Sequence, residues 1–401
     1  MRILTWLAFV ILTLSPAVAL ASVGDDKPAQ FDSPAKLKPG QTGLLKSKSK
    51  GMAYFLRVPR KFDPKASARL VVFLHGSNMN GLDYLRSFES MSWADDAILC
   101  CPNGEKGTDP FGQNNFTFDS ASYVADVTEE VQRAFKPTVT YVGGHSQGGF
   151  LTYSVILLFP DLYQGALPMA GDCWMQNEPN LWEDEPKVHE RQKEIAIAVI
   201  HGKADPVVAF SQGQHAYDCF RAMGWTKLRL YAPEHLEHQF MLSPVDDALH
   251  WLDAMNGREP KRSLDLARDW AKGDEWGWVL EVAKTSKDKS PALVKSAEVA
   301  AAKAVEKMTA AMKGKPADWV PQWLEFWRVY GASAAAQPLV AKYLDKRHDQ
   351  RRDGARLFEE ARGLLRGEKK SEGYEKLEEL LRVAPCTYEA YYAQSWLAER
   401  K

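Results

Sequence analysis

The residues VTYVGGHSQGGFLTYSVILLF, at positions 139–159, indicate the fold of the first half of this 401-residue chain. It begins with a short β-prone run at 139–142, passes through a glycine-rich turn, and ends in an apolar segment at 150–159 that has the length of a helix. A strand, a sharp turn and a helix in this order give a G-x-S-x-G pattern chemical meaning. The serine of that pattern is Ser146.

A nucleophilic serine on such a turn needs a strained backbone, and the residues two positions away must lack side chains so that strand and helix can pack closely. Gly144 and Gly148 meet this requirement. The Ser146 hydroxyl is then expected to project above the sheet, with the N–H of Gln147 at a helix N-terminus, aimed where an oxyanion would form. The alternative is a glycine-rich turn that happens to contain a serine.

Outward from this turn, residues 30–256 alternate between short aliphatic runs and helical patterns. Expected strands lie at 53–58, 70–75, 97–101, 139–142, 165–169, 195–201 and 227–231, and expected helices at 122–135, 150–159, 210–223 and 244–255. Alternation at this pitch predicts an α/β fold with a doubly wound, mostly parallel sheet. Ligands of such sheets bind at the carboxyl ends of the strands.

Two histidines follow the expected strand at 227–231, and either could serve as the base for Ser146. We expect His238 to be that base and keep His235 as the alternative. Three others, His75, His145 and His201, are better explained as structural neighbours of the motifs that contain them.

The acid that orients the base is expected to be Asp205, which follows the strand at 195–201. Glu234 and Asp172 are weaker substitutes. The chain order serine, aspartate, histidine is the order that this type of sheet requires. A second oxyanion donor is expected in the loop after the strand at 70–75, where the backbone N–H of Ser77 would join that of Gln147.

The motifs LHGSNMNG (74–81), CPNG (101–104), GGHSQGGF (143–150), HGKADPVV (201–208) and EHQF (237–240) together resemble those of an α/β-hydrolase. The chain is most similar to the phospholipase/carboxylesterase, dienelactone-hydrolase-like and secreted feruloyl-esterase or polyhydroxybutyrate-depolymerase group, over residues 53–255. The resemblance implies a Ser146–Asp205–His238 triad, an oxyanion hole from the amides of Ser77 and Gln147, and no metal or cofactor. It departs from the dienelactone hydrolases in having serine where they carry cysteine.

The expected function is therefore a secreted serine carboxylic-ester hydrolase that forms an acyl-enzyme on a small-molecule or polymer ester. Two alternatives stay open: a non-catalytic hydrolase-fold scaffold with a helical interaction domain, and a serine peptidase. A formal net charge of −1 gives no reason to expect a nucleic-acid partner. The loop at 172–193, with Trp174 and Trp182, is expected to form a lid or substrate wall.

Residues 1–21 have the form of a cleavable signal peptide. Arg2 precedes an apolar run at 3–14, and a Ser-Pro break and small residues follow. The run is shorter than the ~20 residues that span a bilayer, and no later segment is long and apolar enough to do so. We therefore expect the mature chain to be secreted or periplasmic and to have no membrane span.

From residue 262 to 401 the composition turns to Ala, Leu, Glu, Lys and Arg, which predicts an all-α C-terminal domain. The segment 357–385 faintly resembles a tetratricopeptide repeat, in a single passable copy. This domain is expected either to contact a protein partner or to cover the active site. Residues 22–256 carry a net charge of −7 and residues 257–401 a net charge of +5, which suggests that the two parts dock on each other.

The cysteines are few for an exported chain, and none of their spacings resembles a zinc site. Export permits one or two disulfides. It is an equally good interpretation that the cysteines are small apolar residues buried in the core. The five cysteines are Cys100, Cys101, Cys173, Cys219 and Cys386.

Overall fold

The computed structural model of the chain describes residues 27–63, 68–117, 119–173, 186–258, 260–285, 290–344, 347–367, 369–385 and 387–399. The expected signal peptide lies outside these residues, as do Trp174, Trp182 and Cys386. Within them, none of the helices has both the length and the apolar character needed to cross a bilayer.

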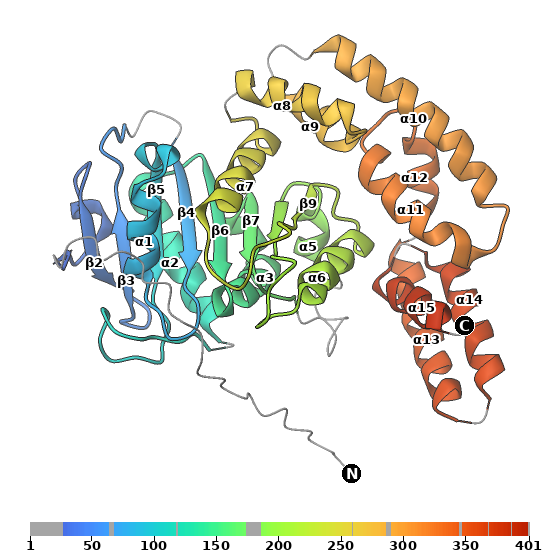
Figure 1. The fold of residues 1–401 in the computed structure, drawn as a ribbon, viewed down its shortest axis with the longest axis horizontal. Coiled ribbons are helices and arrows are strands. Elements are labelled where there is room, and N and C mark those ends of the chain that lie inside the picture. The colour runs from blue at the N-terminus through green and yellow to red at the C-terminus, as the bar shows by residue number, and fades with distance from the viewer. Residues whose placement is uncertain are drawn as a thin grey trace.

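In the described part of the chain, nine strands form one twisted sheet in the order β1-β2-β3-β5-β4-β6-β7-β8-β9 (Figure 1). Pairing from β5 through β9 is parallel throughout, while β3 runs antiparallel to both β2 and β5. The strands are β1 (Ala29–Gln30), β2 (Thr42–Lys46), β3 (Ala53–Arg57), β4 (Arg69–Leu74), β5 (Ala97–Pro102), β6 (Val139–His145), β7 (Gly165–Met169), β8 (Ala196–Ile200) and β9 (Leu228–Tyr231).

The two faces of the sheet bury separate hydrophobic cores, because successive side chains of a strand point to opposite faces. Leu70, Val72 and Leu74 of β4 pack beneath α2, α3 and α6, whereas Val71 and Phe73 pack toward α1 and α7. Coverage on both faces explains why these strands read as continuous aliphatic runs. The expected α/β-hydrolase sheet, doubly wound and mostly parallel, is therefore confirmed.

The helices that belong to the sheet follow the expected ranges closely, with two additions at α1 and α5. The sequence did not predict these two helices, which begin at glycine and proline, nor the short strands β1 and β2. The helices are α1 (Gly81–Glu89), α2 (Ser120–Phe135), α3 (Gln147–Leu158), α5 (Pro186–Arg191), α6 (Phe210–Ala222) and α7 (Leu242–Met255).

A buried ion pair joins the centre of the sheet to α7. The Arg69 guanidinium at the start of β4 is fully buried and contacts the carboxylates of Asp253 and Asp96. Asp253 also accepts a hydrogen bond of 2.9 Å from the Tyr141 hydroxyl of β6. Burial alone would lower the pKa of Arg69, but the two carboxylates outweigh it and raise that pKa. The arginine therefore stays charged within the core.

The described residues from 260 onward form helices that arch away from the sheet and return toward it, as Figure 1 shows in yellow to red. This agrees with the expected helical C-terminal region. The helices are α8 (Pro260–Lys272), α9 (Trp276–Thr285), α10 (Pro291–Ala311), α11 (Pro316–Tyr330), α12 (Gln337–Leu344), α13 (Arg347–Arg366), α14 (Lys370–Val383) and α15 (Tyr388–Glu399).

The helical region meets the sheet region in two places. At the first, Trp270 of α8 and Trp278 of α9 join the core beneath α7, where Trp278 packs edge-on against Trp251 at 5.6 Å between ring centroids. At the second, Ala222 at the end of α6 belongs to the core formed by α11, α13, α14 and α15. The tryptophans of α8 and α9 thus act as packing residues.

Ion pairs across this boundary run opposite to the net charges of the two parts. Lys227 pairs with Glu281 of α9 at 3.3 Å, and Arg221 of α6 pairs with Glu325 of α11 at 3.6 Å. In both pairs the basic residue comes from the acidic sheet region and the acidic residue from the basic helical region. Local pairs and aromatic packing, rather than net charge, therefore describe the contact between the two parts.

Candidate active site

Ser146 is the single residue between β6, which ends at His145, and α3, which begins at Gln147. Its backbone has φ 54° and ψ −118°, a conformation that L-residues other than glycine adopt at a cost. The Ser146 N–H donates to the carbonyl of Met169 on β7 at 2.9 Å, and its own carbonyl accepts from Phe150 N at 3.0 Å. The strand-turn-helix expected around the G-x-S-x-G pattern is therefore present.

The flanking glycines permit this turn because backbone passes very close to them. A Cβ on Gly144 would lie 2.3 Å from the carbonyl oxygen of Gly148, and a Cβ on Gly148 would lie 2.3 Å from that of Leu74. Real Cβ atoms do not approach backbone oxygen this closely, so any side chain would push α3 away from the sheet. The expectation that both positions must lack side chains is confirmed.

The three residues predicted as a triad lie in one hydrogen-bonded line. His238, in the loop between β9 and α7, places Nε2 at 2.9 Å from Ser146 Oγ and Nδ1 at 2.8 Å from Asp205 Oδ2. Asp205, in the loop after β8, also accepts from the N–H groups of Val207 and Val208 through Oδ1 at 2.9 and 2.8 Å. The turn after β6 and the loops after β8 and β9 therefore place all three residues at the carboxyl edge of the sheet.

The Asp205 carboxylate is held in its charged form. Burial would raise its pKa, but the hydrogen bond with His238 and those from the backbone N–H groups of Val208 and Val207 lower it below the usual range. A charged Asp205 keeps the proton of His238 on Nδ1, which leaves the Nε2 lone pair directed at the Ser146 hydroxyl.

The alternative residues are engaged elsewhere or face solvent. His235 is exposed, whereas the His238 side chain is 20% exposed. Glu234 pairs with Lys203 at 2.5 Å on the surface, and Asp172 bonds to His215 at 2.8 Å. The hydrogen bonds to Ser146 and Asp205 thus belong to His238.

Three histidines expected to be structural are buried at the carboxyl ends of β4, β6 and β8. His75 Nε2 accepts from Gly104 N at 3.0 Å, and its Nδ1 lies 2.7 Å from the Gly76 carbonyl. His201 Nε2 lies 2.8 Å from the carbonyl of Val208, in the loop that carries Asp205. Burial lowers the pKa of His75 and of His145, in each case to about 4, so both are neutral near pH 7.

His145 and Tyr84 connect three loops of the site. No sequence motif had pointed to Tyr84, which lies outside the motif at 74–81. The neutral His145 donates from Nε2 to the backbone carbonyl of His238 at 2.7 Å. Its Nδ1 then accepts from the Tyr84 hydroxyl at 2.8 Å, and the same hydroxyl oxygen accepts from the Gly76 N–H at 3.2 Å. The serine turn, the histidine loop and the loop after β4 are thereby fixed to one another.

The predicted oxyanion donors lie at the same edge of the sheet. Strands β4 and β6 pair in parallel, with Leu74 opposite Gly144. Ser77 and Gln147 come at the same sequence distance after Leu74 and Gly144, respectively. Gln147 is the first residue of α3, so its N–H belongs to the first turn, where N–H groups have no carbonyl partner within the helix. The Gln147 side chain is occupied separately, because it bonds both the N–H and the carbonyl of Phe116.

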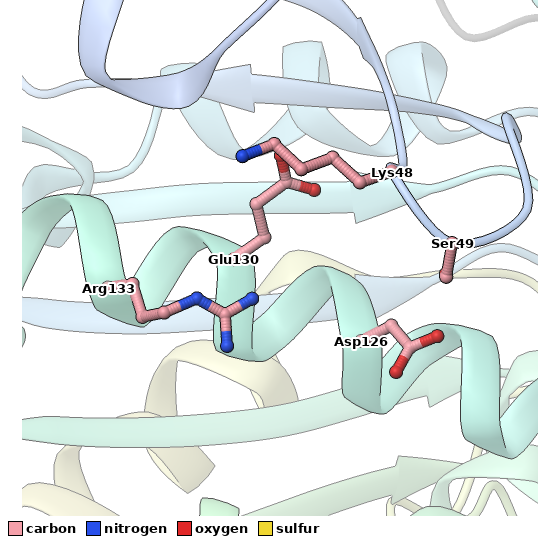
Figure 2. A pocket seen from close by; sticks show the side chains of 5 residues that line it. All are labelled: Lys48, Ser49, Asp126, Glu130 and Arg133. Carbon is pink, nitrogen blue, oxygen red and sulfur yellow. The ribbon is translucent and has the colours of Figure 1, made fainter.

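A hollow of about 100 Å³ lies elsewhere on the molecule, between α2 and the turn after β2 (Figure 2). Glu130 of α2 points toward Lys48, and Asp126, Arg133 and Ser49 complete the lining of the hollow. None of the residues around Ser146 lines this hollow, so it is separate from the candidate active site.

Residues 111–256 match the sequence model of the phospholipase/carboxylesterase family. With the sheet and the helices described above, this match supports an α/β-hydrolase of the phospholipase/carboxylesterase group for the sheet region.

Two curated proteins and two solved structures illustrate the likeness. Carboxylesterase SOBER1 of Arabidopsis thaliana is 29% identical over 102 residues, 25% of this chain and 42% of that protein. Acyl-protein thioesterase 1 of Candida albicans is 22% identical over 112 residues, 28% of this chain and 47% of that protein. The chain thus spans less than half of the length of these relatives.

Among solved structures, acetyl xylan esterase from Aspergillus awamori is similar with a TM-score of 0.43 and 12% identity, covering 53% of this chain and 99% of that one. Zea mays acyl-protein thioesterase 2 is similar with a TM-score of 0.41 and 19% identity, covering 50% and 97%.

Replacing Tyr84 by Phe should destabilise the protein, because the buried Nδ1 of His145 and the N–H of Gly76 both lose their partner. We expect the free energy of unfolding to fall by about 1–3 kcal/mol in a denaturant titration. Tyr231→Phe is the matched control, since its hydroxyl bonds the Asp247 carbonyl at the surface. Equal losses in the two variants would contradict the role given to the Tyr84 hydroxyl.

Proposed function

We propose that the protein is a serine carboxylic-ester hydrolase that works through Ser146, His238 and Asp205. The observation that carries this proposal is the continuous line of hydrogen bonds from Ser146 Oγ through His238 to Asp205, at 2.9 and 2.8 Å. Such a line allows one histidine to take the serine proton as the hydroxyl attacks.

In the first half of the reaction, Ser146 Oγ bonds to the acyl carbon while its proton passes to His238 Nε2. The bond from the acyl carbon to the leaving oxygen then breaks, and His238 delivers the proton to the departing alcohol. In the second half, water gives a proton to the same nitrogen and its oxygen bonds to the acyl carbon. The acid is released when the Ser146 oxygen leaves and recovers that proton.

Negative charge on the acyl oxygen would be met by the N–H groups of Gln147 and Ser77. The position of Gln147 at the N-terminus of α3 supports this role, because that end of a helix carries partial positive charge and free donors. The loop that carries Ser77 is fixed through the hydrogen bond from Gly76 to Tyr84. A preorganised pair of donors would stabilise each tetrahedral intermediate.

An ester is favoured over a peptide by the kinds of protein that this chain resembles, since their names describe a carboxylesterase and an acyl-protein thioesterase. The complete hydrogen-bonded line also speaks against the scaffold alternative, in which nothing would maintain it. A substrate panel of feruloyl, acetyl-sugar, lipid, polyester and thioester substrates would define the acyl and leaving groups.

Ser146→Ala should abolish hydrolysis of short-chain p-nitrophenyl esters, with kcat/KM falling by about 10³-fold or more, because the variant lacks the nucleophile. Ser154→Ala, a half-buried serine further along α3, is the matched control and should hydrolyse the esters like the parent. Hydrolysis that survives in Ser146→Ala, or its absence from the parent for every acyl length, would refute the proposed mechanism.

The same assay separates the two histidines. His238→Gln should lose activity to a similar extent as Ser146→Ala, whereas the exposed His235→Gln should stay close to the parent rate. The opposite pattern would move the base to His235.

We further propose that residues 1–21 direct export, on the basis of the charge, apolar run and small residues in that segment. The full chain expressed in a bacterial host should appear outside the cytoplasm with an N-terminus near residue 22, as read by intact-mass measurement. A variant that lacks residues 2–21 is the control and should stay in the cytoplasm. Export of that variant, or retention of an uncleaved full chain, would contradict this proposal.

A further inference from the structure

A second cluster of reactive side chains lies apart from the triad, between the end of β7 and α6. Cys173 follows β7, and His215 and Cys219 lie one turn apart on the same face of α6. One sulfur or nitrogen atom from each of the three residues lies within 4.8 Å of the others. Cys173 and Cys219 are 7% and 0% exposed, so the group is enclosed by protein.

The imidazole of His215 is oriented so that one particular nitrogen faces the sulfur atoms. Its Nδ1 lies 2.8 Å from Asp172 Oδ1, which can only accept while the carboxylate is charged. Its Nε2 lies 3.3 Å from Cys219 Sγ. A carboxylate that holds the remote nitrogen of a histidine is the arrangement that orients histidine ligands in metal sites.

We propose that Cys173, Cys219 and His215 bind one Zn²⁺ ion through their two Sγ atoms and Nε2. Tetrahedral zinc bound at about 2.3 Å from sulfur and about 2.0 Å from nitrogen separates such donors by about 3.5–3.8 Å. The 3.3 Å between Cys219 Sγ and His215 Nε2 is close to that spacing, so only small side-chain movements are needed. Two thiolates and an imidazole are also a donor set that zinc prefers over harder cations.

A zinc ion bound at these three residues would displace the protons of its ligands and release them to solvent.

The site would link three parts of the fold. The ion would join the segment after β7 to α6, and the Tyr392 hydroxyl of α15 lies 2.9 Å from the His215 Nε2 atom that would bind it. Zinc would therefore hold the sheet region at the point where the C-terminal helix contacts it. Its role is structural, since these residues take no part in the line of hydrogen bonds to Ser146.

Cobalt and zinc titrations of the full chain test this site without reference to catalysis. The protein is purified with a chelator under reducing, anaerobic conditions, and Co²⁺ is then added. We expect one equivalent to produce the near-ultraviolet sulfur-to-cobalt band and the visible bands of a tetrahedral thiolate site, and Zn²⁺ to displace it. Saturating Zn²⁺ should raise the Tm by about 5–10 °C.

Cys219→Ser and His215→Asn should lose the cobalt spectrum and the rise in Tm, while Cys100→Ala retains both. Cys100 is the matched control because it is a buried thiol of β5 outside the cluster. Because the parent protein alone gives the spectrum, the test does not depend on the stability of the variants.

Three results would overturn the proposal. The first is a reduced parent protein that binds neither Co²⁺ nor Zn²⁺ at micromolar concentration. The second is a Cys219→Ser variant that binds them as tightly as the parent. The third is a disulfide between Cys173 and Cys219, mapped by mass spectrometry in protein kept anaerobic from lysis onward, since the two sulfurs would then be bonded to each other.

Discussion

The candidate active site depends on one constraint, the closeness of backbone to backbone where β6 turns into α3. Gly144, Gly148 and Leu74 approach one another too closely to accommodate a side chain. This contact holds Ser146 at φ 54°, a conformation that costs on the order of 1–3 kcal/mol and persists only because the packing around it enforces it. The same turn directs the serine hydroxyl out of the sheet and begins α3 immediately after it, so that a single feature places both the hydroxyl and the helix N-terminus.

The loops that complete the site come from different strands and are held in register by buried neutral groups. Tyr84 and His145 tie the loop after β4 to the carbonyl of His238. His201 supports the loop of Asp205 from below through the carbonyl of Val208. These histidines sit within the sequence motifs, yet their part is to position backbone rather than to transfer protons. Asp205 stays charged, because backbone N–H groups and His238 compensate its burial.

The sequence predicted most of the sheet because central parallel strands are buried on both faces and so consist of uninterrupted aliphatic residues. It missed β2 and α1, whose segments mix glycine and charged residues with apolar ones, since only one side of each is buried. The three proposed triad residues could be predicted because they follow predicted strands in a known order. The sequence favoured His238 over His235, although both follow the same strand, and in the structure the imidazole hydrogen-bonded to Ser146 is that of His238. The cluster of Cys173, His215 and Cys219 could not be predicted from the sequence. Tertiary packing brings these residues together, and their spacing along the chain is not typical of a zinc site.

The measurement that addresses the proposed chemistry most directly is covalent labelling with an alkyl fluorophosphonate, followed by peptide mapping. These reagents bond to a serine only when a neighbouring base activates it. We predict a single adduct, located on Ser146 and formed faster than on any of the other serines of the chain. An unlabelled protein, or an adduct on a different residue, would contradict the assignment of Ser146 as an activated nucleophile.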